Sequence, residues 1–527
     1  MSTRILAPER APERDQFTGL LRAEWTKLRT VRGWVTALLA AALLIVGFGV
    51  LPGMQGSCGK NGPGSECELP VGPGGEQVTD SFTFVGQSMT GDGSVTVRLA
   101  SLTGVLPPEP GDGGHAPGHQ AAGDAAGEGG RPGLAPWAKA GLIIKDGTTP
   151  GSSYAAVMLT GGHGIRMQYD YTHDIAGRPA SAGSPHWLRL SRAADTLTGY
   201  ESADGAHWTR VGSARLPGLP STVRAGLFTT SPQYTELTKE GFGGVGAAGG
   251  PTKATGTFDR LGRTGGWSGG AWTGQTIGGS PQQHGEFRQA GGRFTLTGSG
   301  DIAPAVSGSG GLGTTVTQTL IGTFAGLLAV VVLGATFITA EYRRGLIRTT
   351  VAASPRRGRV LAAKAVVLAA AAFATGLVSA ALVVPLGQRV LRGNGVYVAP
   401  ASPLTEVRLI VGTAGLLAVA AVLALGIGTL LRRSATAVAA VTVVIVLPYL
   451  LAVSVLPAGA GQWLLRLTPA AGFAIQQSAV RYGQVSSVYT AAEGYFPLSP
   501  WAGFAVLCAW AALVLSVAFR AFRRRDV

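Results

Sequence analysis

Long apolar runs alternate with polar segments along the chain, and six of the runs are long enough to cross a membrane as helices. Each run is rich in Ala, Val, Leu and Gly and nearly free of charge. A helix needs about 20 such residues to cross roughly 30 Å of hydrocarbon. The pattern therefore predicts six transmembrane helices, at residues 34–52, 317–340, 360–386, 407–431, 435–456 and 500–520.

A second pattern fills the segment between the first and second runs. Here short stretches alternate apolar and polar residues, as in "SFTFVGQ", "SVTVRLASL", "GIRMQYDY" and "TLTGYES", and Gly, Asp-Gly or Pro separates them. Alternation with a period of two predicts strands with one buried face, and Asp204-Gly205 predicts a hairpin turn. Residues 53–313 are therefore expected to form an all-β antiparallel sandwich.

Two features interrupt this predicted sandwich. Residues 107–135, "PPEPGDGGHAPGHQAAGDAAGEGGRPGLA", lack the apolar residues that a core needs and predict a low-complexity loop. Cys58 and Cys67 are the one Cys pair outside the apolar runs, and an oxidising exterior favours a disulfide between them. After the fifth run, residues 457–500 are too short and polar for a seventh span and are expected as a re-entrant or interfacial hairpin.

Composition and charge placement fix the expected orientation. Only 13% of the residues are charged, about half the usual fraction of a soluble protein. The net charge of +15 gathers beside the apolar runs, in residues 1–33, in 343–364, at Arg432-Arg433 and in the final "FRAFRRRDV". With six spans these segments share one side, which the positive-inside rule makes cytoplasmic. We expect a multi-pass plasma-membrane protein with both termini cytoplasmic, residues 53–313 extracellular and no nucleic-acid partner.

The cytoplasmic residues 1–33 contain a predicted amphipathic helix, "QFTGLLRAEWTKLRTVRGW". Phe17, Leu21, Trp25 and Leu28 share one helical face, which suits a helix in the membrane interface whose basic side chains reach lipid headgroups. Glu24 falls inside the apolar sector, where a helix that only anchors to lipid has no use for a carboxylate. The candidate residues of this interfacial helix are Glu24, Trp25, Lys27 and Arg29.

The segment after the second run, "AEYRRGLIRTTVAASPRRGRVLAAK", concentrates positive charge and contains residues that typically end or begin helices. Ser354-Pro355 predicts a helix start, because Ser caps a helix and Pro suits its first position. A topology signal needs only the positive charges. A lipid anchor explains the arginines but not Glu341 or the Ser-Pro break. The third interpretation is a docking surface for another protein.

Within the predicted sandwich, the strands resemble those of concanavalin A-like jelly-roll domains. The similarity lies in "WAKAGLIIKDG", "HWLRLSRAADTLTGYESADGAHWTRVG" and "VRAGLFTTS", within residues 80–260. That family includes carbohydrate-binding members, so the resemblance implies a candidate extracellular glycan partner. Trp187, Tyr200 and Trp208 are the candidate sugar-stacking residues, and core packing is the alternative role for them.

The membrane part resembles the permeases of ABC type 2 transporters over residues 16–53 and 317–527. That family pattern has an acidic residue at the end of the second span, then Gly, then Pro, Arg and Lys leading into the third. The N-terminal "LLRAEWTKLRTVRGW" is similar to the helix that precedes the family's first span. The resemblance implies a cytoplasmic coupling segment, 341–359, whose candidate ATPase-coupling residues are Glu341, Arg343, Arg344, Gly345, Pro355, Arg356, Arg357, Arg359 and Lys364.

The resemblance implies the membrane subunit of an exporter, working as a homodimer or heterodimer of permease chains among membrane lipids. A separate ABC ATPase subunit would bind ATP and Mg²⁺, since no G-x-x-x-x-G-K-[ST] motif occurs in the sequence. No cofactor, metal ligands or catalytic residues are expected in this chain. The competing interpretation is a membrane-anchored glycan-binding receptor or cell-wall sensor, and a membrane enzyme is the third. The cargo remains open.

Overall fold

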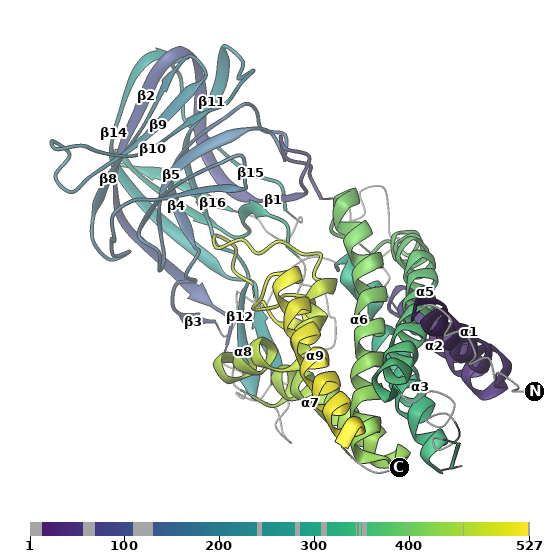
Figure 1. Cartoon of the computed structure of the whole chain (residues 1–527). Helices are drawn as coiled ribbons and strands as arrows, with labels where there is room; N and C mark the ends of the chain where they lie inside the picture. Colours follow the sequence, from purple (N-terminus) through teal and green to yellow (C-terminus); the bar gives the residue numbers. More distant parts are fainter. Residues whose placement is uncertain are drawn as a thin grey trace, which may run out of the picture. The chain divides into compact units, whose positions relative to one another are not determined.

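The chain forms two compact units in the computed structural model (Figure 1). The helical unit comprises Met1–Ser57, Thr314–Ala479 and Thr490–Val527, and the β unit comprises Cys58–Gly313 and Val480–Tyr489. The described residues are 13–55, 69–108, 130–239, 245–279, 285–306, 314–343, 345–346, 349, 356–396, 398–456, 458–487 and 489–524.

Six helices of the helical unit are long and apolar enough to cross a membrane, which confirms the prediction of six apolar helices. Most of them begin and end within a few residues of the predicted runs, but α3 begins six residues later than predicted and α5 continues seven residues further. These helices are α2 (Arg32–Gln55), α3 (Thr323–Arg343), α5 (Arg357–Gly393), α6 (Pro403–Leu431), α7 (Ser434–Ser454) and α9 (Pro500–Arg524). Shorter elements are α1 (Glu13–Thr30), η2 (Val316–Leu320), α8 (Ala458–Leu467), η3 (Pro469–Gln476) and η4 (Ala491–Glu493).

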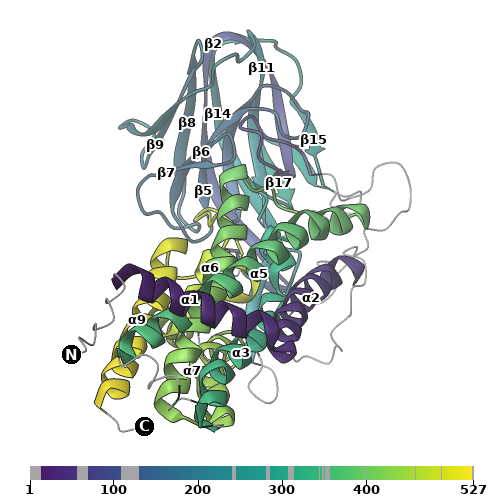
Figure 2. The same ribbon diagram turned by 45° about the vertical axis from the view of Figure 1, so that its right-hand side comes forward.

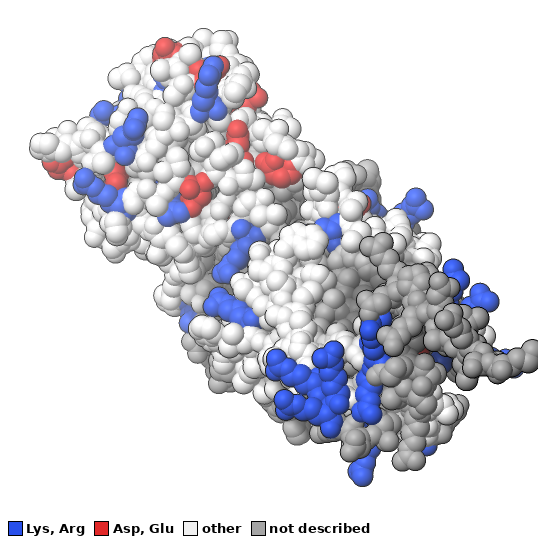
Figure 3. All heavy atoms as spheres, viewed as in Figure 1, with Lys and Arg blue, Asp and Glu red and all other residues white. Residues whose placement is uncertain are grey.

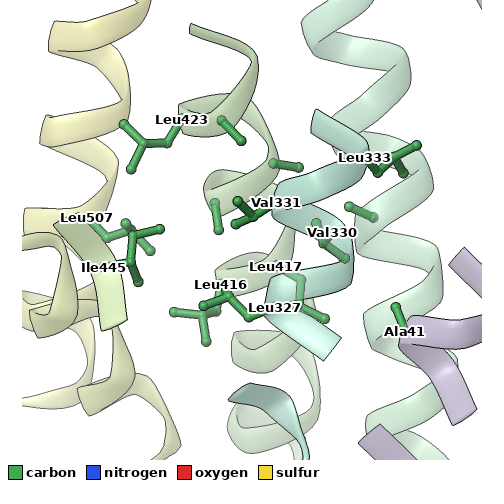
Figure 4. Close-up of a cluster of buried hydrophobic side chains, with 14 of the residues drawn as sticks. Ala41, Leu327, Val330, Val331, Leu333, Leu416, Leu417, Leu423, Ile445 and Leu507 are labelled. Atoms are coloured by element: carbon green, nitrogen blue, oxygen red, sulfur yellow. The ribbon is translucent and has the colours of Figure 1, made fainter. Parts of the chain in front are cut away.

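Helix α6 lies at the centre of the helical unit, where it contacts α3, α5, α7 and α9. Small residues allow this close packing: a Cβ on Gly334 of α3 would lie 2.6 Å from the Ala421 carbonyl oxygen of α6. A Cβ on Gly426 would lie 2.9 Å from a methyl group of Val514 on α9. Between these contacts, side chains such as Leu327 of α3 and Leu417 of α6 form a continuous apolar core (Figure 4).

The segment after α7 folds against the helical unit as a broken hairpin. Helix α8 ends at Leu467, and the chain continues from Pro469 as η3, every residue of which is buried. Phe473 stacks on Phe324 of α3 at a ring distance of 4.4 Å, and η3 packs against α9. The interruption at Pro469 follows from the ring, which cannot continue the hydrogen bonding of α8.

The β unit is a barrel-like sandwich built around one 14-stranded sheet, which confirms the predicted all-β fold. Nine strands follow the order β10-β9-β8-β2-β11-β4-β5-β6-β7. Their bounds are β2 (Phe82–Leu106), β4 (Lys139–Lys145), β5 (Tyr154–Thr160), β6 (Ile165–Tyr169), β7 (His173–Ala176), β8 (His186–Ala193), β9 (Thr196–Ser202), β10 (Thr209–Arg215) and β11 (Thr222–Thr230). The other strands are β1 (Val78–Asp80), β3 (Arg131–Pro132), β12 (Tyr234–Lys239), β13 (Val245–Gly250), β14 (Lys253–Trp267), β15 (Thr273–Ile277), β16 (Glu286–Ala290), β17 (Arg293–Gly298) and β18 (Ile302–Pro304).

Strand β2 joins the two layers of the sandwich. Its first half pairs with β11 and β15, and its second half pairs with β8 and β14. The sequence predicted two strands here, but Gly91 and Gly93 bend one continuous strand instead of ending it. Gly91 has φ +69°, and the register of β14 shifts opposite this point. Glycine tolerates that conformation without steric cost, so the pairing continues through it.

Strands β4 and β5 are buried on both faces. One face lines the main core, and the other packs on a second apolar cluster that includes Phe82, Tyr154 and Phe228. Two buried cations extend from the ends of β4: Lys139 Nζ lies 2.6 Å from Asp301, and Lys145 Nζ lies 2.9 Å from Asp80. Pairing of each buried ammonium with a carboxylate offsets part of its desolvation cost.

A segment far along the chain completes the β unit. Residues Val480–Tyr489, between α7 and α9 in sequence, belong to this unit and not to the helical one. The buried Gln484 donates hydrogen bonds from Nε2 to the carbonyl oxygens of Tyr171 (3.3 Å) and Thr172 (3.1 Å). We call Val480–Tyr489 the C-terminal strap. Sequence reasoning did not predict it, because nothing in its composition points to a partner 300 residues earlier.

Candidate functional site

Helix α1 presents a carboxylate on the face that packs against the helical unit. Glu24 is only 1% exposed and Leu28 only 3%, whereas Trp25 is 46% exposed and Arg29 is exposed. Figure 2 shows α1 lying across the helical unit, and its neighbours there are α5 and α2. The acidic residue that looked misplaced in an apolar sector therefore points into the protein.

Glu24 joins three other charged side chains, which we call the ionic cluster: Glu24, Lys27, Glu341 and Lys364. Lys364 Nζ on α5 lies 2.8 Å from Glu24 and 2.6 Å from Glu341 at the end of α3. Lys27 Nζ on α1 lies 2.9 Å from Glu24 and 3.1 Å from Glu341. Each ammonium thus bridges both carboxylates, and one cluster connects α1, α3 and α5.

Three of the four side chains in the ionic cluster are buried, which makes their mutual pairing important for stability. Lys364 is fully buried beneath the ring of Phe337, 5.0 Å from its centroid, and Glu341 is 5% exposed. Burial opposes the charge on Lys27, but hydrogen bonds and proximity to Glu24 and Glu341 outweigh it and raise the pKa of Lys27. Two cations balance two anions. Loss of Lys364 or of either carboxylate leaves an unbalanced buried charge, whereas Lys27 is partly exposed and its charge is screened by solvent.

An arginine-lined cavity lies at the start of α5. It has a volume of about 600 Å³ and is formed by the first turns of α5 and the last turns of α9, and none of the described residues that line it carries a carboxylate. We call it the arginine cavity. Its lining residues are Arg356, Arg357, Gly358, Arg359, Ala362, Phe519 and Arg523. On the face shown in Figure 3, the charged side chains described in the helical unit are almost all basic.

The predicted coupling residues therefore divide into two groups. Glu341 and Lys364 lie in the ionic cluster, together with Glu24 and Lys27 of the interfacial helix. Arg356, Arg357 and Arg359 line the arginine cavity, and Arg343 is exposed at the end of α3. Gly345 has φ +68°, while Arg344 and Pro355 lie outside the described residues.

Two details differ from the sequence-based expectation at this elbow. Helix α5 begins at Arg357 with Arg356 as its N-cap, two residues after the predicted first helical position at Pro355, and Ser354 and Pro355 themselves lie outside the described residues. Sequence reasoning also missed Phe337, Phe519 and Arg523. The basic C-terminal end was visible in the sequence only as a topology signal, and its proximity to α5 follows from packing.

The candidate sugar-stacking residues lie on one outer part of the β unit, and all three are partly exposed. Guanidinium groups cover two of the rings: Arg189 lies 3.9 Å from the Trp208 ring centroid, and Arg260 lies 5.7 Å from that of Trp187. Tyr200 pairs across strands with Arg189. The two tryptophan rings are thus held beside cations rather than in the core.

The predicted turn at Asp204-Gly205 is confirmed, with Gly205 at φ +79° between β9 and β10. The predicted disulfide residues Cys58 and Cys67 lie outside the described residues, as do residues 109–129 of the predicted loop. The end of that loop, Arg131–Pro132, pairs with β2 as β3. Among the described residues, no group of three or more His, Cys, Asp or Glu side chains could hold a metal ion.

Comparison with known proteins adds one strong match. The model of a family described as "ABC-2 family transporter protein" matches residues 177–527, more than half of the chain. This match includes the second half of the β unit and all helices from α3 to α9. No curated protein matches the chain.

Three solved structures show weak similarity. A functionally unknown protein from Saccharomyces cerevisiae is 15% identical, with 38% of this chain and 82% of that chain covered and a TM-score of 0.21. The GH43 protein BlXynB from Bacillus licheniformis, as a mutant, is 17% identical, with 33% and 27% covered and a TM-score of 0.18. Scytalido-glutamic peptidase is 9% identical, with 41% and 98% covered and a TM-score of 0.22. Scores this low carry no argument about function.

Proposed function

Because the chain belongs to the ABC-2 transporter family, we propose that it forms the transmembrane pathway of an exporter driven by a separate ATPase chain. The family consists of membrane transport subunits, and the six apolar helices agree with a multi-pass permease. Family membership favours this function over a glycan receptor or a membrane enzyme. ATP and Mg²⁺ would bind to the ATPase subunit.

The orientation follows from the basic residues. Arginines gather where α3 ends, where α5 begins and where α9 ends, and the positive-inside rule makes this side cytoplasmic. Both termini are then cytoplasmic, and residues 53–313 lie outside the plasma membrane. Membrane lipids would contact the apolar residues that remain exposed on α2 and α7, such as Leu43 and Val443.

The single observation that carries the coupling proposal is the ionic cluster. Lys364 follows Arg357 by seven residues, about 10 Å along the helix axis. An ATPase that pushes on the arginine cavity therefore moves the helix whose buried Lys364 contacts both α1 and α3. The cluster would make the three helices move together at their cytoplasmic ends.

Two carboxylate-bridging lysines suit this role better than apolar contacts would. Apolar side chains can slide past one another at little cost, whereas separating buried ion pairs exposes each charge to a medium that solvates it poorly. A displacement of α5 would then also displace α1 and α3, because the ion pairs prevent the three helices from sliding past one another. A second permease chain, identical or different, would supply the other half of the pathway.

Charge reversal at opposite ends of α5 tests this function. Arg356→Glu alters the rim of the arginine cavity, and Arg389→Glu is the matched control, since both arginines are exposed, one at the N-cap of α5 and one near its other end. The tagged full-length chain is purified with its associated ATPase, and nucleotide hydrolysis is measured in proteoliposomes. We expect Arg356→Glu to lose the associated ATPase or its stimulation, and Arg389→Glu to retain both.

Two results would reject the proposal. If no ATPase accompanies the unmodified chain, the assignment of a separate driving subunit is wrong. If both variants retain the ATPase and its activity equally, or lose them equally, the docking role of the arginine cavity is wrong, although family membership still stands.

A further inference from the structure

A second cationic cavity lies in the β unit, separate from the helical site. It has a volume of about 640 Å³ and lies between β14 and the hairpin formed by β16 and β17. Three arginines and one aspartate supply its charged lining. The lining residues are Asp259, Arg260, Arg288, Ala290, Gly291, Gly292, Arg293 and Thr295.

Strand register explains why the hairpin arginines share this cavity. Arg288 pairs with Thr295, and Ala290 pairs with Arg293, so these four residues lie on one face of the hairpin. Alternation places Phe287 and Phe294 on the opposite face, where Phe294 is 4% exposed and packs into the core. The aromatic face anchors the hairpin and thereby fixes the direction of the arginine face.

The third arginine comes from an irregularity in β14. Between Asp259 and Gly262 the register with β2 shifts, and Arg260 has φ +51°, which is unusual for a residue with a side chain. The bulge turns Arg260 away from normal alternation, and its guanidinium lies over the Trp187 ring. Cation–π contact with indole holds a guanidinium while leaving its N–H groups available.

The aspartate does not neutralise these three arginines. Asp259 accepts two hydrogen bonds from Arg98 of β2, at 2.7 Å from Nε and 2.6 Å from Nη2. This bidentate pair is neutral as a unit. Arg260, Arg288 and Arg293 therefore leave three positive charges around an open cavity, and all three side chains are exposed.

The rim of the cavity is open to a ligand. Gly291 and Gly292 form the turn of the hairpin with φ +56° and +76°, and no atom of the part of the chain that the structure describes lies within 4 Å of the position that a Cβ would take on either residue. Side chains at these positions would narrow the approach between Arg288 and Arg293. The two glycines thus adopt the positive φ angles of the turn, and their lack of side chains keeps the entrance of the cavity accessible.

We propose that this cavity binds a phosphate group, carried by a small anion, a phosphodiester polymer or a lipid headgroup. The planar guanidinium fork matches two phosphate oxygens at once, and several forks around one cavity suit a group that offers oxygens in several directions. A neutral sugar fits less well, because the rings of Trp187 and Trp208 each have a guanidinium over one face. This site is independent of the ATPase coupling proposed above.

Binding to the full-length chain in detergent micelles tests the site. The probes are inorganic phosphate, a glycerol-phosphate oligomer, soluble short-chain phosphatidylglycerol, oligogalacturonate as a carboxylate control and dextran as a neutral control. We expect at least one phosphate probe to bind more tightly than both controls, and the one that binds best identifies the source of the phosphate. Arg288→Ala with Arg293→Ala should weaken that binding about tenfold or more.

Two further variants make the result specific. Arg210→Ala with Arg215→Ala removes the same charge from exposed positions elsewhere in the β unit and should leave the affinity within about twofold at 0.15 M salt. Arg288→Lys with Arg293→Lys keeps the charge and loses the fork, so affinity should fall by an intermediate factor. The proposal is overturned by equal losses in the two Ala pairs, by tighter oligogalacturonate binding, or by no binding of any phosphate probe.

Discussion

Lys364 Nζ lies 2.8 Å from Glu24 Oε2, although 340 positions separate the two residues in sequence. Lys364 is fully buried and Glu24 is 1% exposed, so water cannot replace either partner. The same ammonium lies 2.6 Å from Glu341. The first helix of the chain is therefore joined to α3 and α5 through one side chain.

Replacing that side chain with an apolar one should destabilise the helical unit strongly. Lys364→Met leaves Glu24 and Glu341 buried with only Lys27 between them, which costs roughly 3–5 kcal/mol for an uncompensated buried charge. Thermal unfolding in detergent should show the loss. The double variant Lys364→Met with Glu24→Gln restores charge balance, because Lys27 and Glu341 remain paired, and should be more stable than Lys364→Met alone. A double variant as unstable as the single one contradicts this account.

Lys27 should matter less than Lys364 although it contacts the same carboxylates. Its side chain is 39% exposed, so solvent screens its charge, and Lys364 still bridges Glu24 and Glu341 when Lys27 is absent. Lys27→Ala is expected to lower the free energy of unfolding by about 1 kcal/mol or less. The same unfolding measurement shows which lysine replacement destabilises the protein more. A larger loss of stability on replacing Lys27 than on replacing Lys364 would be inconsistent with the observed burial.

Gly345 and Gly358 should respond to alanine with opposite signs. Gly345 has φ +68°, and no atom of the described residues lies within 4 Å of a Cβ placed there, so Gly345→Ala costs about 1–2 kcal/mol from backbone strain. Gly358 is helical, and a Cβ there would make an ordinary 3.5 Å contact with Phe519. Gly358→Ala should be neutral or stabilise by a few tenths of a kcal/mol. The melting temperature should fall for Gly345→Ala and stay the same or rise for Gly358→Ala. Equal shifts in the two variants would contradict this prediction.

The turn before Trp208 should show a defined pH window. The Asp204 carboxylate accepts a hydrogen bond from His207 at 2.6 Å, which lowers the pKa of Asp204 and raises the pKa of His207. The stabilisation that ionised Asp204 provides is fully present above pH 3.8, the ordinary pKa of the carboxyl, and is lost as pH falls through its lowered pKa. The stabilisation that protonated His207 provides is fully present below pH 6.5, the ordinary pKa of the imidazole, and is lost as pH rises through its raised pKa.

The pair is therefore fully formed between about pH 4 and 6.5. Titration of the His207 imidazole by NMR should give a pKa above 6.5, and Asp204→Asn should return it toward that value. An unchanged His207 pKa in the Asp204→Asn variant would show that the hydrogen bond is absent in solution.

Gln484 should hold the C-terminal strap against the β unit. Gln484→Glu places carboxylate oxygens against two carbonyl oxygens that now receive N–H donors, so it should loosen the strap more than Gln484→Ala does. Hydrogen exchange of residues 480–487 measures the change, and exchange should be fastest in the Glu variant. Similar exchange in all three proteins would mean that the strap is held by other contacts.

The apolar helices and most strands could be predicted from the sequence because local patterns determine them. The runs that became α6 and α9 contain almost no charge, and "TLTGYES" alternates as β9 does. Strand β2 was predicted as two strands because Gly91 and Gly93 look like a turn. They support a bend only because β11 and β14 continue the pairing on either side.

The candidate site could be predicted only in part. Glu24 was conspicuous because a carboxylate has no place on a lipid-facing surface, but its partner Lys364 could not be found from spacing. The same limit applies to Phe519 and Arg523, which reach the arginine cavity through the packing of α9 near α5. Contacts between residues hundreds of positions apart leave no local pattern, since each residue is locally compatible with many partners.

The C-terminal strap also sets the order in which the protein can be assembled. Gln484 emerges from the ribosome only after the β strands and the helices through α7 have been made, yet its amide closes hydrogen bonds with Tyr171 and Thr172. The β unit can collapse early around its own core, but its last piece arrives with the segment that precedes α9. Completion of that unit thus requires that synthesis has passed residue 489 and that the strap has returned to the β strands.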